Sequence, residues 1–218
     1  MNLIATQPNP TWTMDQLRKH FGMIPATRIL LQPRPGTATE KDAYQLNEYE
    51  GHLCELVDGV LVERVRDENA SSLSLWIGRW LHAYLESKAK GKLLGVRGFL
   101  RLTPGLVRSA CVSFILWNRY PRGKPTVAPI SPDLAVEVVG KGNTRKELSR
   151  KRRDFFTHGT RLVWQVDERK RFVEVYTSPK KPDQRLGIDD TLDGGDVLPG
   201  FKLTLRKLFS PPGSGRKR

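Results

Sequence analysis

The sequence predicts an α/β (α+β) fold with an N-terminal β-hairpin, and three features predict it. Residues 53–65 (LCELVDGVLVERV) contain two β-rich runs joined by Asp58-Gly59, a dipeptide typical of type I′ hairpin turns. Residues 71–91 carry apolar side chains at helical spacing and end at Gly91, which predicts a long helix. Short apolar runs after it predict strands at residues 98–104 (GFLRLTP), 111–117 (CVSFILW) and 133–139 (DLAVEVV).

A second helix is predicted after these strands, with clear signals at both ends. Thr144 followed by Glu147 fits a capping box, in which each side chain satisfies a free backbone N–H group. Gly159 predicts the stop, because glycine accepts the left-handed conformation just past a helix end. Two further strands are predicted at residues 160–167 (TRLVWQVD) and 171–177 (RFVEVYT).

The apolar stripe of this second helix does not decide which of two basic side chains points toward the core. Leu148, Phe155 and Phe156 mark the stripe. Lys151 and Arg152 follow Leu148 by three and four residues, so either side chain can reach inward. Spacing alone does not choose between them.

Composition indicates a soluble protein and raises the question of a polyanionic partner. Of the 218 residues, 37 are Lys or Arg and 23 are Asp or Glu, which gives a net charge of +14. Such an excess suits nucleic acid as a partner, but charge alone does not choose between that partner and a merely solvated basic surface. Cys54 and Cys111 are too few for a disulfide framework, so we expect a cytoplasmic location. No apolar run approaches the ~20 residues of a membrane span. The N-terminus lacks a signal-peptide pattern, so we expect neither membrane association nor secretion.

Changes in composition along the chain predict three parts. Residues 1–45, rich in Pro, Thr and Gln with one short helix candidate at 13–21, form an N-terminal arm. Residues 46–209 form the folded domain. Residues 210–218 (SPPGSGRKR) form a disordered basic tail.

The strand at residues 133–139 raises a question about its acids. Its two faces are both fairly apolar, so we expect it to be covered on both sides, where an ionised carboxylate is rarely left unpaired. Asp133 and Glu137 lie on one face, four residues and ~13 Å apart at ~3.3 Å per residue, too far apart to share one ion. We interpret Asp133 as a residue of the strand start or turn.

Six segments, taken in order, resemble a known family. They are CELVDGVLVE (54–63), VRSACVSFI (107–115), SPDLAVEVVGKGNT (131–144), KRRDFFTHG (151–159), LVWQVDE (162–168) and VLPGFKLTLRKLF (197–209). The ordered set resembles the Uma-two family of putative restriction endonucleases, a branch of the PD-(D/E)XK nuclease superfamily. The resemblance implies a restriction-endonuclease-like domain at 46–209, with a mixed central β-sheet flanked by helices. It also implies Mg²⁺ or Mn²⁺ as cofactor and DNA phosphodiesters as substrate.

The resemblance also implies roles for three residues. Glu137 matches the family's second acid, which holds the metal. The usual lysine position is occupied by Val139, but the family's helix has a lysine at the place of Lys151, which favours Lys151 over Arg152. Glu55 matches another family acid, which either supports the site or finishes the hairpin. A structural alternative for Glu137 is a plain salt bridge to Lys151.

Two positions depart from the family pattern. Family members have Pro-Asp where this chain has Ala110-Cys111, so the first metal-binding aspartate is replaced by Cys111. A thiol is a soft ligand suited to zinc or iron and a poor substitute in a Mg²⁺ site. Gly140 stands where the family commonly has Ser.

Two functional hypotheses follow. The first is a divalent-metal-dependent DNA endonuclease with a site weakened at Cys111, in which the basic run 141–153 tracks phosphates. The second is a degenerate nuclease-fold protein that binds DNA or a protein partner without cutting. A homodimer is compatible with both.

Overall fold

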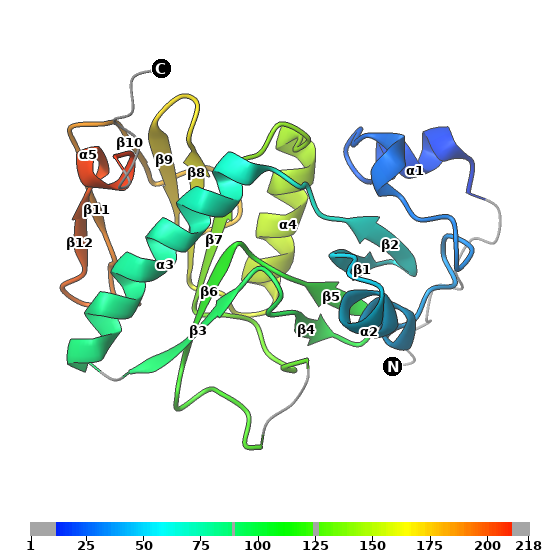
Figure 1. Cartoon of the computed structure of the whole chain (residues 1–218), viewed down its shortest axis with the longest axis horizontal. Helices are drawn as coiled ribbons and strands as arrows, with labels where there is room; N and C mark the ends of the chain where they lie inside the picture. The colour runs from blue at the N-terminus through cyan, green and yellow to red at the C-terminus, as the bar shows by residue number, and fades with distance from the viewer. Residues whose placement is uncertain (1–11, 89, 124–126, 211–218) are drawn as a thin grey trace.

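The central β-sheet of the protein is six-stranded and mixed. The computed structural model describes residues 12–88, 90–123 and 127–210. The strand order of this sheet is β10-β9-β8-β7-β6-β3, in which β7 and β8 are parallel and the other neighbouring pairs are antiparallel (Figure 1). The strands are β3 (Gly91–Gly95), β6 (Val112–Leu116), β7 (Leu134–Val138), β8 (Leu162–Asp167), β9 (Phe172–Tyr176) and β10 (Gln184–Leu186). The mixed central sheet implied by the family resemblance is therefore confirmed.

The predicted hairpin belongs to a second sheet with order β2-β1-β5-β4. Its strands are β1 (Cys54–Val57), β2 (Val60–Glu63), β4 (Leu100–Thr103) and β5 (Leu106–Arg108). Asp58 and Gly59 have φ angles of 50° and 69°, both positive as a type I′ turn requires. The hairpin prediction is confirmed. A third pair, β11 (Thr191–Asp193) with β12 (Lys202–Thr204), lies at the opposite end of the molecule from α1 (Figure 1).

Two long helices cover the two faces of the central sheet. These two helices are α3 (Glu68–Lys88) and α4 (Arg145–Thr157). The other helical elements are α1 (Met14–His20), the 3-10 turn η1 (Ala26–Arg28), α2 (Glu40–Tyr49) and α5 (Leu205–Leu208). Apolar residues of α3 form the largest core cluster with Leu134 and Val136 of β7. Phe155 of α4 packs with Ala135 on the other face. The alternation along β7 therefore directs Glu137 to the α4 side of the sheet.

The long-helix prediction is correct in kind and wrong at its end. The helix α3 ends at Lys88, and Gly91 begins β3 instead of terminating the helix. A Cβ atom at Gly91 would lie 2.3 Å from Phe114 Cε2, so glycine is needed here for close approach to β6. Helix α2 and strand β3 were not predicted. Among the described helices, none is both long and apolar enough to cross a membrane.

Helix α4 has the predicted ends. The Thr144 side chain accepts from Glu147 N, the Glu147 side chain accepts from Thr144 N, and the helix stops before Gly159 at φ 99°. Leu148 and Phe155 are buried as predicted, whereas Phe156 is only partly buried. The cap fixes where each side chain of α4 points, including that of Lys151.

The described part of the N-terminal arm packs on the hairpin and on the start of α4. Phe21 and Ile29 share a core cluster with Val62 of β2. Arg28 pairs with Glu147, with Nη2 and Oε1 2.5 Å apart. Helix α2 spans the predicted boundary at 45/46, and the predicted tail lies outside the described residues from 211 onward. The division into arm, domain and tail stays a prediction.

Gly59 combines a left-handed backbone with close packing against the arm. A Cβ at Gly59 would lie 2.5 Å from Gly36 O, whereas at Gly105, with a similar φ of 77°, nothing lies within 4 Å. Both alanine substitutions carry a left-handed strain of about 1–2 kcal/mol. We expect Gly59→Ala to lower the free energy of unfolding by clearly more than Gly105→Ala, as measured by urea unfolding. Equal losses would show that the contact with Gly36 is not tight in solution.

Candidate active site

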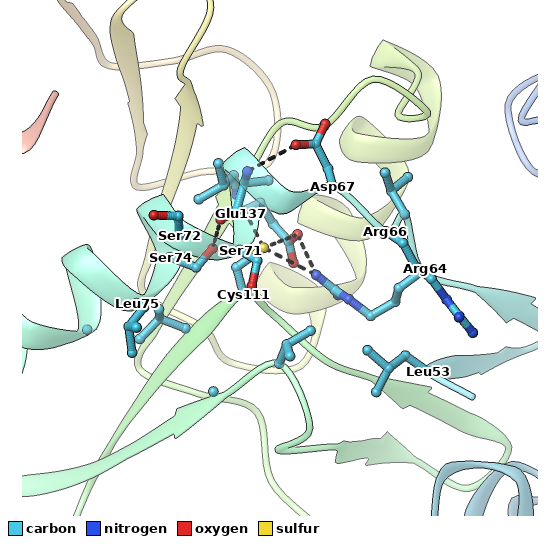
Figure 2. A pocket seen from close by; sticks show the side chains of 18 of the residues that line it. Leu53, Arg64, Arg66, Asp67, Ser71, Ser72, Ser74, Leu75, Cys111 and Glu137 are labelled. Atoms are coloured by element: carbon cyan, nitrogen blue, oxygen red, sulfur yellow. Dashed lines mark hydrogen bonds and ion pairs between the residues drawn. The ribbon is translucent and has the colours of Figure 1, made fainter. Parts of the chain in front are cut away.

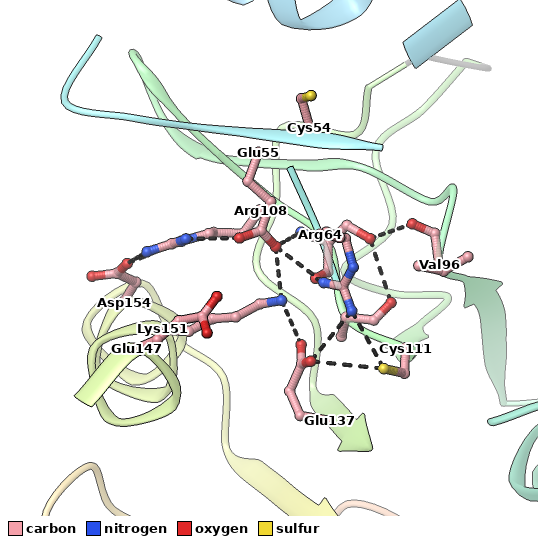
Figure 3. A network of polar contacts seen from close by, with 12 residues as sticks. Cys54, Glu55, Arg64, Val96, Arg108, Cys111, Glu137, Glu147, Lys151 and Asp154 are labelled. Atoms are coloured by element: carbon pink, nitrogen blue, oxygen red, sulfur yellow. Dashed lines mark hydrogen bonds and ion pairs between the residues drawn. The ribbon is translucent and has the colours of Figure 1, made fainter. Parts of the chain in front are cut away.

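Four residues singled out in the sequence meet in one cluster (Figure 3). Lys151 Nζ lies 2.7 Å from Glu55 Oε1 and 2.7 Å from Glu137 Oε1. Cys111 Sγ lies 3.7 Å from Glu137 Oε2. These side chains come from β1, from the residue before β6, from β7 and from α4. Segments distant in the sequence thus supply one polar centre.

Strand register and helix phase explain this meeting. Cys111 N donates to Val136 O at 3.0 Å, which places Cys111 beside Glu137 on the neighbouring strand. The Cys111 sulfur also accepts from Val138 N at 3.4 Å. Lys151 lies about two turns after the Thr144 cap of α4 and points toward the sheet, where it is buried.

The structure shows which of Lys151 and Arg152 reaches Glu137, a choice that spacing left open. Both side chains are buried, but Arg152 Nη1 donates to Gln165 Oε1 at 3.1 Å and Nε donates to Pro179 O at 3.1 Å. Its guanidinium also lies 3.9 Å from the centre of the Tyr176 ring. Lys151 is therefore the cation of α4 that joins Glu137, and Arg152 supports the sheet further along.

Arg64, which the sequence analysis did not single out, contacts several members of the same centre. Its Nη1 lies 3.1 Å from Glu55 Oε1 and also donates to Ser109 O. Its Nη2 lies 3.3 Å from both Glu137 Oε2 and Cys111 Sγ. Arginine is common on protein surfaces, and the sequence around Arg64 carries no signal that its side chain is largely withdrawn from solvent.

Arg108 is a second arginine that the sequence analysis did not single out, and it contacts the other carboxylate oxygen of Glu55. Its Nη1 donates to Glu55 Oε2 at 2.7 Å, and its Nε donates to Asp154 Oδ2 at 3.0 Å. The backbone N–H of Ser109 donates to Glu55 Oε1 at 3.0 Å. Glu55 therefore contacts cations of this centre in addition to its place in the hairpin, and its role in a site stays a prediction.

The surroundings of Glu55 stabilise its ionised form. Burial by itself raises the pKa of the carboxyl group, but Lys151, Arg108 and Arg64 together outweigh burial. They hold the pKa of Glu55 well below its ordinary value, so this carboxylate is charged at neutral pH.

The pKa values of Cys111 and Arg64 are both raised, which keeps the thiol neutral and the guanidinium charged. Burial, and next the charge of Glu137, raise the pKa of the Cys111 thiol. Burial alone lowers the pKa of Arg64, but the carboxylates of Glu137 and Glu55 outweigh it and raise the pKa above its ordinary value. The centre therefore holds a neutral thiol beside a permanent guanidinium.

Charges in this centre balance. We define the charged cluster as Glu55, Glu137, Asp154, Arg64, Arg108 and Lys151, together with the Cys111 thiol. Three carboxylates face three cations and the thiol is neutral, so the charged cluster has no net charge.

These residues, as they stand, do not fit Mg²⁺ or Mn²⁺. Such hard cations prefer carboxylate, carbonyl and water oxygens. Within residues 12–88, 90–123 and 127–210, no group of three or more His, Cys, Asp or Glu side chains is arranged to hold a metal ion. Glu137 already contacts two cations, and its neighbour at position 111 is a thiol.

Two other residues noted in the sequence have structural explanations. Asp133 immediately precedes β7 and is fully buried, where it accepts from Leu116 N at 2.9 Å and pairs with Arg119 and Arg161. It stands at the strand start, as expected. At Gly140, a Cβ would lie 2.9 Å from Val65 Cγ1, so a serine would require local rearrangement.

The charged cluster opens onto a large cavity (Figure 2). Its volume is about 1210 Å³, and it is lined by α3, by β3 and by the residues that follow β2. Figure 2 shows Arg64, Cys111 and Glu137 close together in this cavity, with Ser71 and Ser74 of α3 nearby. A ligand in the cavity can thus reach the cluster.

The mixed sheet covered by helices on both faces is the architecture of a restriction-endonuclease-like fold. The family model described as "Uma2: Putative restriction endonuclease" matches residues 41–206, and the chain belongs to this family. The resemblance found in the sequence is thereby confirmed.

A solved structure shares the fold. It is the crystal structure of a protein from Anabaena variabilis described as a "putative nuclease belonging to DUF820", which aligns with a TM-score of 0.64 and 15% identity. The match covers 72% of this chain and 89% of that protein. No curated protein matches the chain.

Proposed function

We propose that this chain is a DNA endonuclease whose divalent-metal-dependent hydrolysis of phosphodiester bonds is weakened. Membership of the family supports the reaction class. The observation that carries the proposal is the convergence of Glu137 and Lys151 at 2.7 Å on the wall of a cavity. In this site Lys151 would offset negative charge that develops on the phosphate.

Weak activity follows from the state of the carboxylates. Beside position 111, β7 contributes the acid Glu137, and position 111 itself carries a neutral thiol in place of a second acid. Both oxygens of Glu137 lie against cations, Lys151 and Arg64. Slow cleavage is therefore the expected behaviour of the chain as it stands.

DNA is the proposed substrate, but the basic run 141–153 is not free to contact it along its length. Lys151 and Arg152 are buried, and Arg150 pairs with Asp58 at 2.5 Å. Exposed cations at the cavity include Arg79, whose guanidinium lies 4.8 Å from the centre of the Trp76 ring. We place the DNA contact along α3. A cytoplasmic location and a homodimer stay predictions from the sequence.

Duplex binding provides the first test. We expect sequence-tolerant affinity that falls steeply with salt, because Lys and Arg contacts to phosphates release counterions. Arg79→Ala should weaken binding severalfold at low salt and reduce the salt slope by about one contact. Lys181→Ala, which removes an exposed charge outside the cavity, is the matched control. Fluorescence anisotropy at several salt concentrations measures both, and equal effects of the two variants would contradict a contact along α3.

Cleavage provides the second test. We expect slow nicking of supercoiled plasmid by the wild type with Mg²⁺ or Mn²⁺, and none by Glu137→Ala. Bound DNA should also slow alkylation of Cys111, which lines the cavity, whereas the buried Cys54 should not react in the folded protein. Equal nicking by wild type and Glu137→Ala would reject the site.

A second candidate function is DNA binding without cleavage. The contacts of Arg64 with Glu137 and Cys111 favour it, because they fill the space beside the acid. Binding with no nicking by wild-type protein at any enzyme concentration would select this function over the first.

A further inference from the structure

The guanidinium of Arg64 has the surroundings of a bound cation. Its two terminal nitrogens contact Glu55 Oε1 at 3.1 Å, Glu137 Oε2 at 3.3 Å, Cys111 Sγ at 3.3 Å and the carbonyl oxygen of Ser109 (Figure 3). These acceptors come from β1, from β7 and from the segment between β5 and β6. Apart from the sulfur, they are carboxylate and carbonyl oxygens, the ligand types that hard metal ions prefer.

We propose that Arg64 is a built-in cation that takes the place of the divalent metal in the DNA-free protein, and that Arg64 and Cys111 together exclude the metal while no DNA is bound. The inference rests on the proposed function, since it takes the charged cluster to be the nuclease site. It explains how the charges of the cluster are balanced by side chains alone, and it names the side chain that must move before a metal ion can bind.

Charge explains why the two residues act as a pair. With a thiol at position 111, Glu55 and Glu137 are balanced by Arg64 and Lys151 on this side of the cluster. A divalent ion added to that set would leave excess positive charge buried, which is costly. An aspartate at position 111 would instead leave one negative charge uncompensated and would favour an additional cation.

Space leads to the same conclusion. Metal–oxygen distances for Mg²⁺ are about 2.0–2.1 Å, so an ion between Glu55 and Glu137 would stand where the guanidinium now lies. Both cannot be present together. Arg64 lines the cavity, so its side chain has somewhere to go when a metal displaces it.

Metal binding without DNA tests the inference directly. We would titrate Mn²⁺ by calorimetry and by electron paramagnetic resonance into the wild type, Cys111→Asp, Arg64→Met and the variant with both changes. We expect no site-specific binding at millimolar Mn²⁺ for the wild type. Arg64→Met and Cys111→Asp each leave one excess negative charge in the cluster and should bind Mn²⁺ weakly. The variant with both changes should bind at least about tenfold more tightly than Cys111→Asp, which corresponds to about 1.4 kcal/mol.

Three controls make the outcome specific. Arg64→Lys in the Cys111→Asp background keeps a cation and should leave Mn²⁺ affinity within about twofold of Cys111→Asp, well under 1 kcal/mol. Glu137→Ala added to the variant with both changes should abolish binding, which places the ion at the cluster. Thermal unfolding checks that each variant is folded, and Arg64→Gln carries the same test if Arg64→Met does not fold.

Two results would overturn the inference. One is wild-type Mn²⁺ affinity equal to that of the variant with both changes, and the other is an unchanged affinity when Arg64 is removed from Cys111→Asp. Cleavage is measured separately on plasmid DNA. Tight Mn²⁺ binding without nicking by the variant with both changes would overturn the proposed endonuclease and support the metal-replacement inference. Nicking by that variant, with no effect of Arg64 on Mn²⁺ affinity, would support the proposed endonuclease and overturn the metal-replacement inference.

Discussion

Cys111→Asp is expected to increase divalent-metal-dependent nicking of plasmid DNA by on the order of tenfold or more, a gain of about 1.4 kcal/mol in transition-state stabilisation. The Cys111 sulfur lies 3.7 Å from Glu137 Oε2, so an aspartate there would place a second carboxylate next to the first. Two carboxylates with water and phosphate oxygens form the ligand set that Mg²⁺ commonly uses. The rate is measured at matched Mg²⁺ and Mn²⁺ concentrations.

The matched controls separate the acid from other effects of the substitution. In Cys111→Asn the new side chain has nearly the shape of aspartate but no charge, so the nicking rate should stay at the wild-type value. Cys111→Asp combined with Glu137→Ala should also give no gain, because one carboxylate is again missing. If the wild type cuts as fast as Cys111→Asp, position 111 is not part of the site. If no variant cuts, the chain binds DNA without cleavage.

Glu55→Gln is expected to lower the free energy of unfolding by about 3–5 kcal/mol, the usual cost of breaking a buried ion pair from one side. The Glu55 carboxylate contacts Lys151, Arg64 and Arg108, all of which are largely withdrawn from solvent. The neutral amide would leave their charges poorly compensated. Urea unfolding at neutral pH measures the loss.

The control for this prediction is Glu48→Gln, at an exposed acid of α2. It should change the free energy of unfolding by no more than about 0.5 kcal/mol. A loss for Glu55→Gln as small as that of the control would show that the charged cluster contributes little net stability.

The same substitution should change how stability depends on pH. The pKa of Glu55 is lower in the folded protein than its ordinary value of 4.5. The stability that it contributes is therefore present above about pH 4.5 and is lost as the pH falls below that value, where the unfolded chain takes up a proton first. We expect the difference between wild type and Glu55→Gln to shrink from pH 5 to pH 3 in urea unfolding. A constant difference would contradict the assigned charge state.

Local signals predicted much of the fold. The Asp58-Gly59 turn, the Thr144 cap and the Gly159 stop were visible because each depends on residues a few positions apart. The end of α3 was misplaced, because the role of Gly91 depends on Phe114, which lies on a strand 20 or more residues away in the sequence. Local propensity contains no information about such a neighbour.

The site was predictable in part. Motif order brought Glu55, Glu137 and Lys151 together in prediction, and it marked Cys111 as the departure from the family pattern. Arg64 was missed because arginine is common on surfaces, and nothing in its sequence neighbourhood distinguishes a buried one.

By itself, the sequence determined a strand that carries Glu137, a capped helix that carries Lys151, and a thiol in place of an aspartate at position 111. These features depend on alternation, capping and the order of motifs along the chain. Only the tertiary structure decided that the Arg64 guanidinium lies between Glu55 and Glu137. That contact joins the β1–β2 hairpin to β7, and Glu137 is 73 residues from Arg64 in the sequence. The side chain that fills the space between buried acids is selected by packing and charge balance in three dimensions.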